Sequence, residues 1–112
     1  MIYIKNKRVT FYSLMTPKED MYLMTPKLKA GTYTLSLDLL GNGGKSSLEL
    51  ISVADVSNKN SFESVVKASE VKGGKKIQTF QLKKEAHLGL KIVLKEMHQA
   101  VYLDNISIQP RR

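Results

Sequence analysis

Strict alternation of apolar and polar side chains is the feature that most constrains how this sequence can fold. Between residues 32 and 40 every second side chain is large and apolar, and the segment 87–95 repeats the pattern. Successive side chains of a β-strand point to opposite faces, so a period of two predicts strands with one buried face. We therefore expect a core between two packed sheets that includes Leu35, Leu37, Leu90, Ile92 and Leu103.

Turn signals separate these alternating segments. Residues 41–44 read Gly-Asn-Gly-Gly, which predicts a tight turn, and we expect the strand at 47–54 to return beside 32–40 as a hairpin. A polar loop is expected at 55–60. Further strands are expected at 62–66, 76–83 and 99–109. About eight short strands with turns roughly every 8–12 residues favour an all-β antiparallel β-sandwich.

The two ends of the chain show less regular patterns. Residues 2–4 and 9–14 are expected to be two strands joined by 5–8. Leu-Met-Thr-Pro-Lys occurs twice, at 14–18 and 23–27, and each proline marks a strand end or an edge because it cannot donate to a ladder. The last strand is apolar on both faces, which predicts a strand covered on both sides. Its apolar residues are Val101 and Leu103 on one face and Tyr102, Ile106 and Ile108 on the other.

The composition excludes several classes of protein. The chain has no cysteine, which excludes a disulfide scaffold, a thiolate zinc site and a cysteine nucleophile. No apolar run approaches the roughly 18 residues of a membrane-spanning helix, so no membrane span is expected. The length of 112 residues suits one domain. We expect residues 1–112 to form a single β-sandwich domain, a module or fragment of a longer chain.

The formal charge of +8 has two interpretations. Five lysines fall at expected turns and strand ends, where they keep edge strands from pairing with other chains. They are Lys72, Lys75, Lys76, Lys83 and Lys84. The alternative is a basic β-barrel that binds nucleic acid. We favour the first interpretation, and expect any binding of nucleic acid to be weak and unspecific.

Residues for catalysis are sparse. The two histidines, His87 and His98, fall in different expected elements. No nucleophile elbow, zinc-binding helix motif or phosphate-binding loop occurs in the sequence. We therefore expect no enzymatic activity.

Three segments, in matching order and spacing, resemble a known group of proteins. Two of them resemble strands of jelly-roll carbohydrate-binding modules and cleaved-adhesin-like domains. They are residues 29–38 (Lys-Ala-Gly-Thr-Tyr-Thr-Leu-Ser-Leu-Asp) and residues 101–108 (Val-Tyr-Leu-Asp-Asn-Ile-Ser-Ile). Residues 22–28 resemble the segment that often precedes the first of these in the adhesin-like group. The resemblance implies a jelly-roll, galactose-binding-like fold in an exported or cell-surface bacterial protein, hence an extracellular location.

The same resemblance implies a non-catalytic module that binds a polysaccharide or surface glycan, or mediates adhesion. The chain departs from the group by its short opening region and its lack of tryptophan, the residue that sugar-binding modules most often stack against pyranose rings. The alternative is a structural spacer on the same fold without a small ligand. The oligomeric state is left open.

Three residues are the candidate site residues. Tyr12 and Tyr22 are the expected carbohydrate contacts because the strand pattern does not require them in the core, whereas Tyr33 and Tyr102 alternate with core positions. Asp104 lies in an apolar strand, so it must be hydrogen-bonded, paired or metal-bound. The resemblance implies that Asp104 helps to hold a structural calcium ion, and the alternative is that it caps a loop or turn. No other cofactor is expected.

Overall fold

The described part of the chain consists almost entirely of β-strands. The computed structural model describes residues 2–13, 20–41 and 46–111. Its elements are β1 (Ile2–Ser13), β2 (Met21–Leu28), β3 (Gly31–Gly41), β4 (Ser46–Val53), the 3₁₀ helix η1 (Lys59–Ser61), β5 (Phe62–Glu70), β6 (Gly74–Leu82), β7 (Ala86–Leu94) and β8 (Gln99–Pro110). No helix within these ranges is long and apolar enough to cross a membrane.

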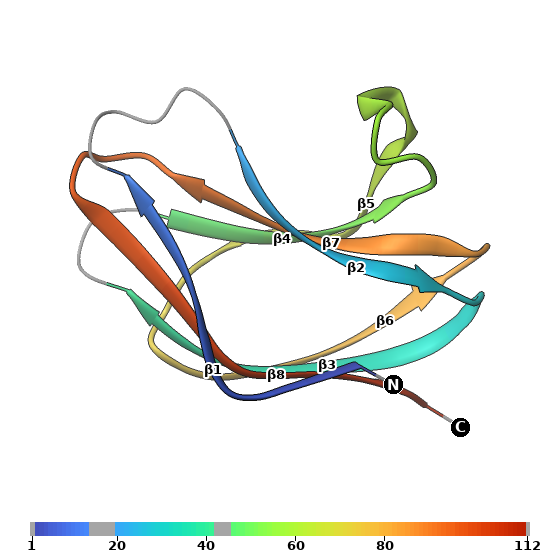
Figure 1. Cartoon of the computed structure of the whole chain (residues 1–112), viewed down its shortest axis with the longest axis horizontal. Helices are drawn as coiled ribbons and strands as arrows, with labels where there is room; N and C mark the ends of the chain where they lie inside the picture. Colours follow the sequence, from blue (N-terminus) through green and yellow to red (C-terminus); the bar gives the residue numbers. More distant parts are fainter. Residues whose placement is uncertain (1, 14–19, 42–45, 112) are drawn as a thin grey trace.

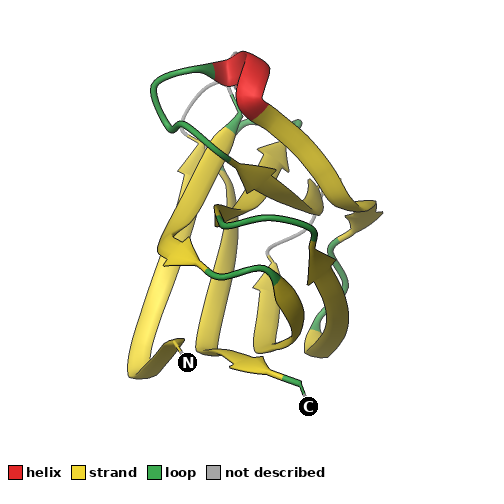
Figure 2. Ribbon diagram, turned by 90° about the vertical axis from the view of Figure 1, so that its right-hand side faces the viewer, coloured by secondary structure: helices red, strands yellow, loops and turns green. Residues whose placement is uncertain are grey.

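The strands form two antiparallel sheets that pack face to face, as Figures 1 and 2 show. Sheet A has the strand order β1-β8-β3-β6, and sheet B has the order β2-β7-β4-β5. Strands consecutive in the chain alternate between the sheets, except for β4 and β5, which are neighbours in sheet B. This topology confirms the expected all-β, jelly-roll β-sandwich.

The core between the sheets confirms the alternation. The five residues expected in the core are each at most 1% exposed, namely Leu35, Leu37, Leu90, Ile92 and Leu103. They belong to one hydrophobic cluster to which β3, β7 and β8 all contribute. Burial of this apolar area is the main stabilising contribution to a domain of this size, which has no disulfide.

The expected hairpin between β3 and β4 is wrong. These strands lie in different sheets, where β3 pairs with β6 and β8 while β4 pairs with β5 and β7. The hairpin is instead β4–β5, connected by the expected polar loop and η1. Alternation fixes which face of a strand is buried, but it does not specify which strand becomes the neighbour.

The two-sided cover expected for β8 is also wrong. Its pairing with both neighbours changes register at Asn105, which has a φ of 53°. This bulge adds a residue to the strand, so Leu103 and Ile106 point into the core although they are three positions apart. Tyr102 and Asp104 instead lie on the outer face of sheet A and are only partly buried.

The N-terminal strands differ from expectation in one detail. β1 is continuous, with a register irregularity between Ile4 and Arg8 where a connection between two strands was expected. The second Thr-Pro lies within β2, an edge strand, at an irregularity between Met24 and Lys27, as the proline predicts. The first copy, 14–18, lies outside the described residues.

Candidate functional site

A second hydrophobic layer lies on the outer face of sheet B, away from the core. Ile51 and Val53 alternate with core-facing residues of β4, so their side chains point to the outside of the sandwich. Nevertheless they are only 5% and 0% exposed. Something on this face must therefore cover them.

Two aromatic rings from opposite edges of sheet B meet over this face. Tyr22 is on β2 and Phe62 begins β5, the two outermost strands of the sheet. Their ring centroids lie 5.6 Å apart in an edge-to-face arrangement. Adjacent strands are spaced about 4.8 Å apart, so the edges of a flat four-stranded sheet would be about 14 Å apart. The rings meet because the sheet bends around its outer face, which Figure 1 shows as β2 and β5 rising from β7 and β4.

Gly89 gives this face its shape. A Cβ built on Gly89 would lie 2.8 Å from Cγ1 of Ile51 and 3.1 Å from the sulfur of Met24. Neither distance leaves room for a methyl group without displacement of a neighbour. The absence of a side chain at Gly89 therefore leaves room for Ile51 and Met24 on this face of the sheet.

A polar network lies beside the aromatic pair. The Lys91 ammonium is 3.3 Å from a carboxylate oxygen of Asp20 and 3.6 Å from one of Glu49. The Ser64 hydroxyl donates to the other Glu49 oxygen at 2.7 Å. Lys91 stands directly opposite Tyr22 in the β2–β7 register.

The surroundings of Lys91 favour its charged form. Partial burial lowers the pKa of Lys91, but its hydrogen bond to Asp20 and attraction by Asp20, Tyr22 and Glu49 outweigh the burial and raise the pKa above its usual value. The outer face of sheet B thus combines aromatic surface with an ammonium group, carboxylates and a hydroxyl. We call Tyr22, Phe62, Lys91, Glu49 and Asp20 the aromatic face.

The two candidate tyrosines are not brought together. Tyr12 is 49% exposed and pairs with Ala100, which places it on the outer face of sheet A. Tyr22 is partly buried and belongs to the aromatic face of sheet B. A ligand on one face cannot contact the other tyrosine. Tyr33, by contrast, is buried, stacks on Phe80 and donates its hydroxyl to the Lys29 carbonyl, as its structural role predicts.

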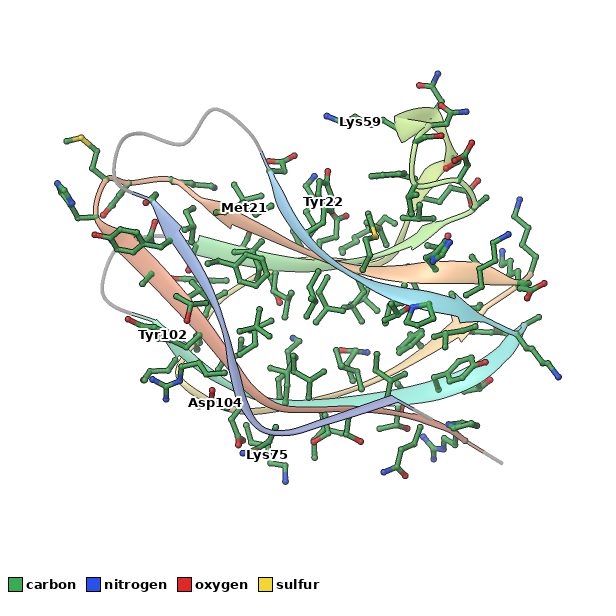
Figure 3. All side chains as sticks on the ribbon, in the orientation of Figure 1. Met21, Tyr22, Lys59, Lys75, Tyr102 and Asp104 are labelled. Atoms are coloured by element: carbon green, nitrogen blue, oxygen red, sulfur yellow. The ribbon has the colours of Figure 1, made fainter. Side chains whose placement is uncertain are left out.

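Asp104 is paired with an arginine. Its two carboxylate oxygens each accept a hydrogen bond of 2.9 Å from the Arg8 guanidinium, which also lies 4.8 Å from the centre of the Tyr102 ring. Asp38, opposite Asp104 on β3, accepts from the Asn105 amide. Figure 3 shows Asp104 and Tyr22 on opposite sides of the sandwich.

This set of donors fits an ion pair better than a calcium ion. Calcium takes six to eight oxygen ligands. Among the described residues there is no group of three or more His, Asp or Glu side chains that could hold a metal. An ion at Asp104 would have to displace Arg8. Calcium at Asp104 stays a prediction, tested by whether calcium raises and a chelator lowers the melting temperature.

The Arg8–Asp104 pair gives a pH-dependent prediction. The hydrogen bonds from Arg8 lower the pKa of Asp104 in the folded protein. The stabilisation is therefore present above the unfolded pKa of about 3.9 and is lost as the pH falls through the lowered value. Asp104→Asn should melt below the parent at pH 7, and the difference should disappear in strong acid. Thermal melts at low salt would measure this, and a difference that does not change with pH would contradict it.

Two clefts lie at the edge where β5 of sheet B faces β6 of sheet A. The first has a volume of about 520 Å³ and lies between β5 and the residues that end and follow β6. The second, of similar volume and more open, lies at the other end of this edge near residues 69–77. Among the described residues, no aromatic side chain lines either cleft.

Sequence reasoning named Tyr22 but missed its partners. Phe62 was expected only to start the strand at 62–66. Neither Glu49 nor Lys91 was among the candidate site residues. Gly89 was the available signal, because a glycine in an alternating strand often marks a close approach of another group.

Comparison with known proteins identifies the fold. No protein-family model and no curated protein matches the sequence. A solved CBM4 carbohydrate-binding module matches with a TM-score of 0.59 and 11% identity, over 98% of this chain and 76% of that chain. A CBM61 module solved in complex with β-1,4-galactotriose matches with a TM-score of 0.57 and 16% identity, over 93% and 70% of the two chains. The chain therefore has the β-sandwich fold of carbohydrate-binding modules, which confirms the resemblance at the level of fold.

Proposed function

We propose that this protein is a non-catalytic glycan-binding module whose site is the aromatic face of sheet B. The observation that supports the proposal most strongly is the meeting of Tyr22 and Phe62 across the whole width of the sheet. An aromatic pair with one ring edge toward the other leaves apolar surface for the faces of sugar rings.

The polar groups beside the pair supply the rest of a glycan site. Sugar hydroxyls both donate and accept hydrogen bonds, so they need acceptors and donors at fixed positions. Glu49 and Asp20 are acceptors and the Lys91 ammonium is a donor, all held in one network. Because the chain has no tryptophan, we expect affinities no tighter than about micromolar to millimolar.

The cellular context is a further part of this proposal. The resemblance of residues 29–38 and 101–108 to strands of secreted modules supports an exported or cell-surface bacterial protein, in which this β-sandwich would be one part of a longer chain. Adhesion through a surface glycan would use the same face.

Replacement of Tyr22 tests the site. Tyr22→Ala removes half of the aromatic pair, so we expect binding of a recognised polysaccharide to weaken about tenfold or more. Tyr12→Ala is the matched control, because Tyr12 lies on the outer face of the other sheet. Calorimetry against a panel of soluble polysaccharides would compare the two variants with the parent. Loss of binding in Tyr12→Ala alone would move the site to sheet A.

The same experiment separates glycan binding from a structural role. A spacer domain would give no heat with any polysaccharide, although the protein in the same sample is folded and melts cooperatively. That result would favour the alternative of a structural β-sandwich without a small ligand.

A further inference from the structure

The first cleft at the β5–β6 edge combines several kinds of polar group over a small apolar floor. Val65 and Leu82 contribute apolar surface, and Gln81 contributes an amide that both donates and accepts. Glu63, Lys83 and Lys84 are exposed and bring one negative and two positive charges. The volume of about 520 Å³ falls within the range of small-molecule sites.

The lysines of this cleft form no ion pair with a carboxylate of the described residues. In the described ranges, the ion pairs join Arg8 to Asp104 and Lys91 to Asp20 and Glu49, and none involves Lys83 or Lys84. Two adjacent unpaired ammonium groups at the mouth of a cleft attract an anion. Lysines that only keep an edge strand from pairing with other chains need to lie at that edge. They do not need to lie together at a cleft.

The cleft adjoins the aromatic face. In the β4–β5 ladder, Ser52 pairs with Glu63 in the cleft, and the next pair along the ladder joins Val53 to Phe62 of the aromatic face. Ser64 also lines the cleft and donates to Glu49 of the aromatic face. An extended ligand on the aromatic face can therefore pass over β5 into the cleft.

We propose that the ligand is an acidic polysaccharide, with a carboxylate or sulfate of one of its sugars bound by Lys83 and Lys84 while a neighbouring sugar contacts Tyr22 and Phe62. This inference rests on the proposed glycan-binding function and specifies its substrate class. A charge-assisted hydrogen bond to an ammonium is stronger than a neutral one, so the acidic group determines selectivity between polymers of otherwise similar structure.

The composition of the cleft favours a polysaccharide over a nucleic acid. Single-stranded nucleic acids bind to proteins mainly by stacking their bases on aromatic side chains along a basic groove. None of the described residues that line the cleft is aromatic, so bases have no ring to stack on there, whereas the lining includes the Glu63 carboxylate. The same carboxylate accepts hydrogen bonds from sugar hydroxyls.

Calorimetry with matched polymers tests this inference. Polygalacturonate would be compared with the same polymer after reduction of its carboxylates to hydroxyls, and chondroitin sulfate with its desulfated form. The two pairs distinguish a carboxylate ligand from a sulfate ligand. We expect the charged member of at least one pair to bind about tenfold or more tightly than its neutral form at low salt, and the difference to shrink as salt rises.

Two double variants of equal charge provide the control. Lys83→Gln with Lys84→Gln should abolish the preference for the acidic polymer. Lys72→Gln with Lys95→Gln removes the same charge at the ends of β6 and β7 away from Lys83 and Lys84, because Lys72 precedes β6 and Lys95 follows β7. This variant should change the affinity for the acidic polymer less than about twofold. Melting temperatures of both variants should match the parent, because these side chains are exposed.

Several results would overturn the inference. Equal loss in both double variants would mean diffuse attraction to the net charge, and equal affinity for both members of each pair would mean that the anion is not recognised. Single-stranded DNA that binds as tightly as the acidic polymer would indicate an unspecific polyanion surface. Binding of neutral polymers alone, lost in Tyr22→Ala, would contradict this inference but support the glycan-binding proposal. No binding of any polymer would contradict both.

Discussion

Leu90→Ala should lower the free energy of unfolding by about 2–5 kcal/mol. Leu90 is 1% exposed at the middle of β7, where it pairs with Leu23 of β2 on one side and Leu50 of β4 on the other. Truncation removes the buried methyl groups and leaves a cavity that a closely packed sheet cannot collapse to fill. Chemical denaturation followed by circular dichroism would measure the change.

The control for this prediction is a valine outside the core. Val56 is 54% exposed in the loop between β4 and η1, so Val56→Ala should change stability by less than about 0.5 kcal/mol. A Leu90→Ala protein as stable as the parent would show that β7 does not lie at the centre of the sandwich.

Gly89→Ala should destabilise the protein by about 1–3 kcal/mol, although alanine is small and the backbone can accept it. The added methyl group would lie 2.8 Å from Cγ1 of Ile51 and 3.1 Å from its Cδ1. Cγ1 is close to the backbone of β4, so it cannot move away freely. Ile51 is on the same outer face of sheet B as the aromatic pair, so we also expect weaker glycan binding in this variant.

A double-mutant cycle with Ile51 isolates this collision. Ile51→Ala removes both of the atoms that the new methyl group would strike, so Gly89→Ala should cost less in that background than in the parent. Equal costs in the two backgrounds would show that Gly89 is required for another reason.

The sequence was sufficient to predict local side-chain direction. In β3 and β7 every second residue enters the core, as alternation predicts, because the direction of a side chain depends only on its own strand. Strand pairing was not predictable in this way. The turn at 41–44 indicated a hairpin, but β3 pairs with β6 and β8, and β4 pairs with β5 and β7. Those partners depend on the packing of the whole sandwich.

The bulge in β8 was the second obstacle. Asn105 adopts a left-handed backbone conformation and shifts the alternation by one residue. From the sequence alone this shift is indistinguishable from a strand with two apolar faces. The position of Asp104 on the outer face, where Arg8 reaches it, follows from the bulge.

The candidate site was predictable only in part. Tyr22 could be named because the strand pattern did not require it in the core. Phe62 could not be paired with it, since the two meet only when the outer strands of sheet B bend toward each other. Gly89 leaves room for Ile51 and Met24 on this face, a close approach that alternation does not describe.

Chemical-shift mapping would show whether a glycan binds the aromatic face of sheet B. A chain of 112 residues gives well-resolved amide spectra, so each strand can be followed as a polysaccharide fragment is added. We predict that the largest shifts occur at Tyr22, Phe62 and Lys91, while those of Tyr12 and Tyr102 stay unchanged. Shifts confined to the outer face of sheet A, in β1, β8 and β3, would contradict a glycan site on sheet B.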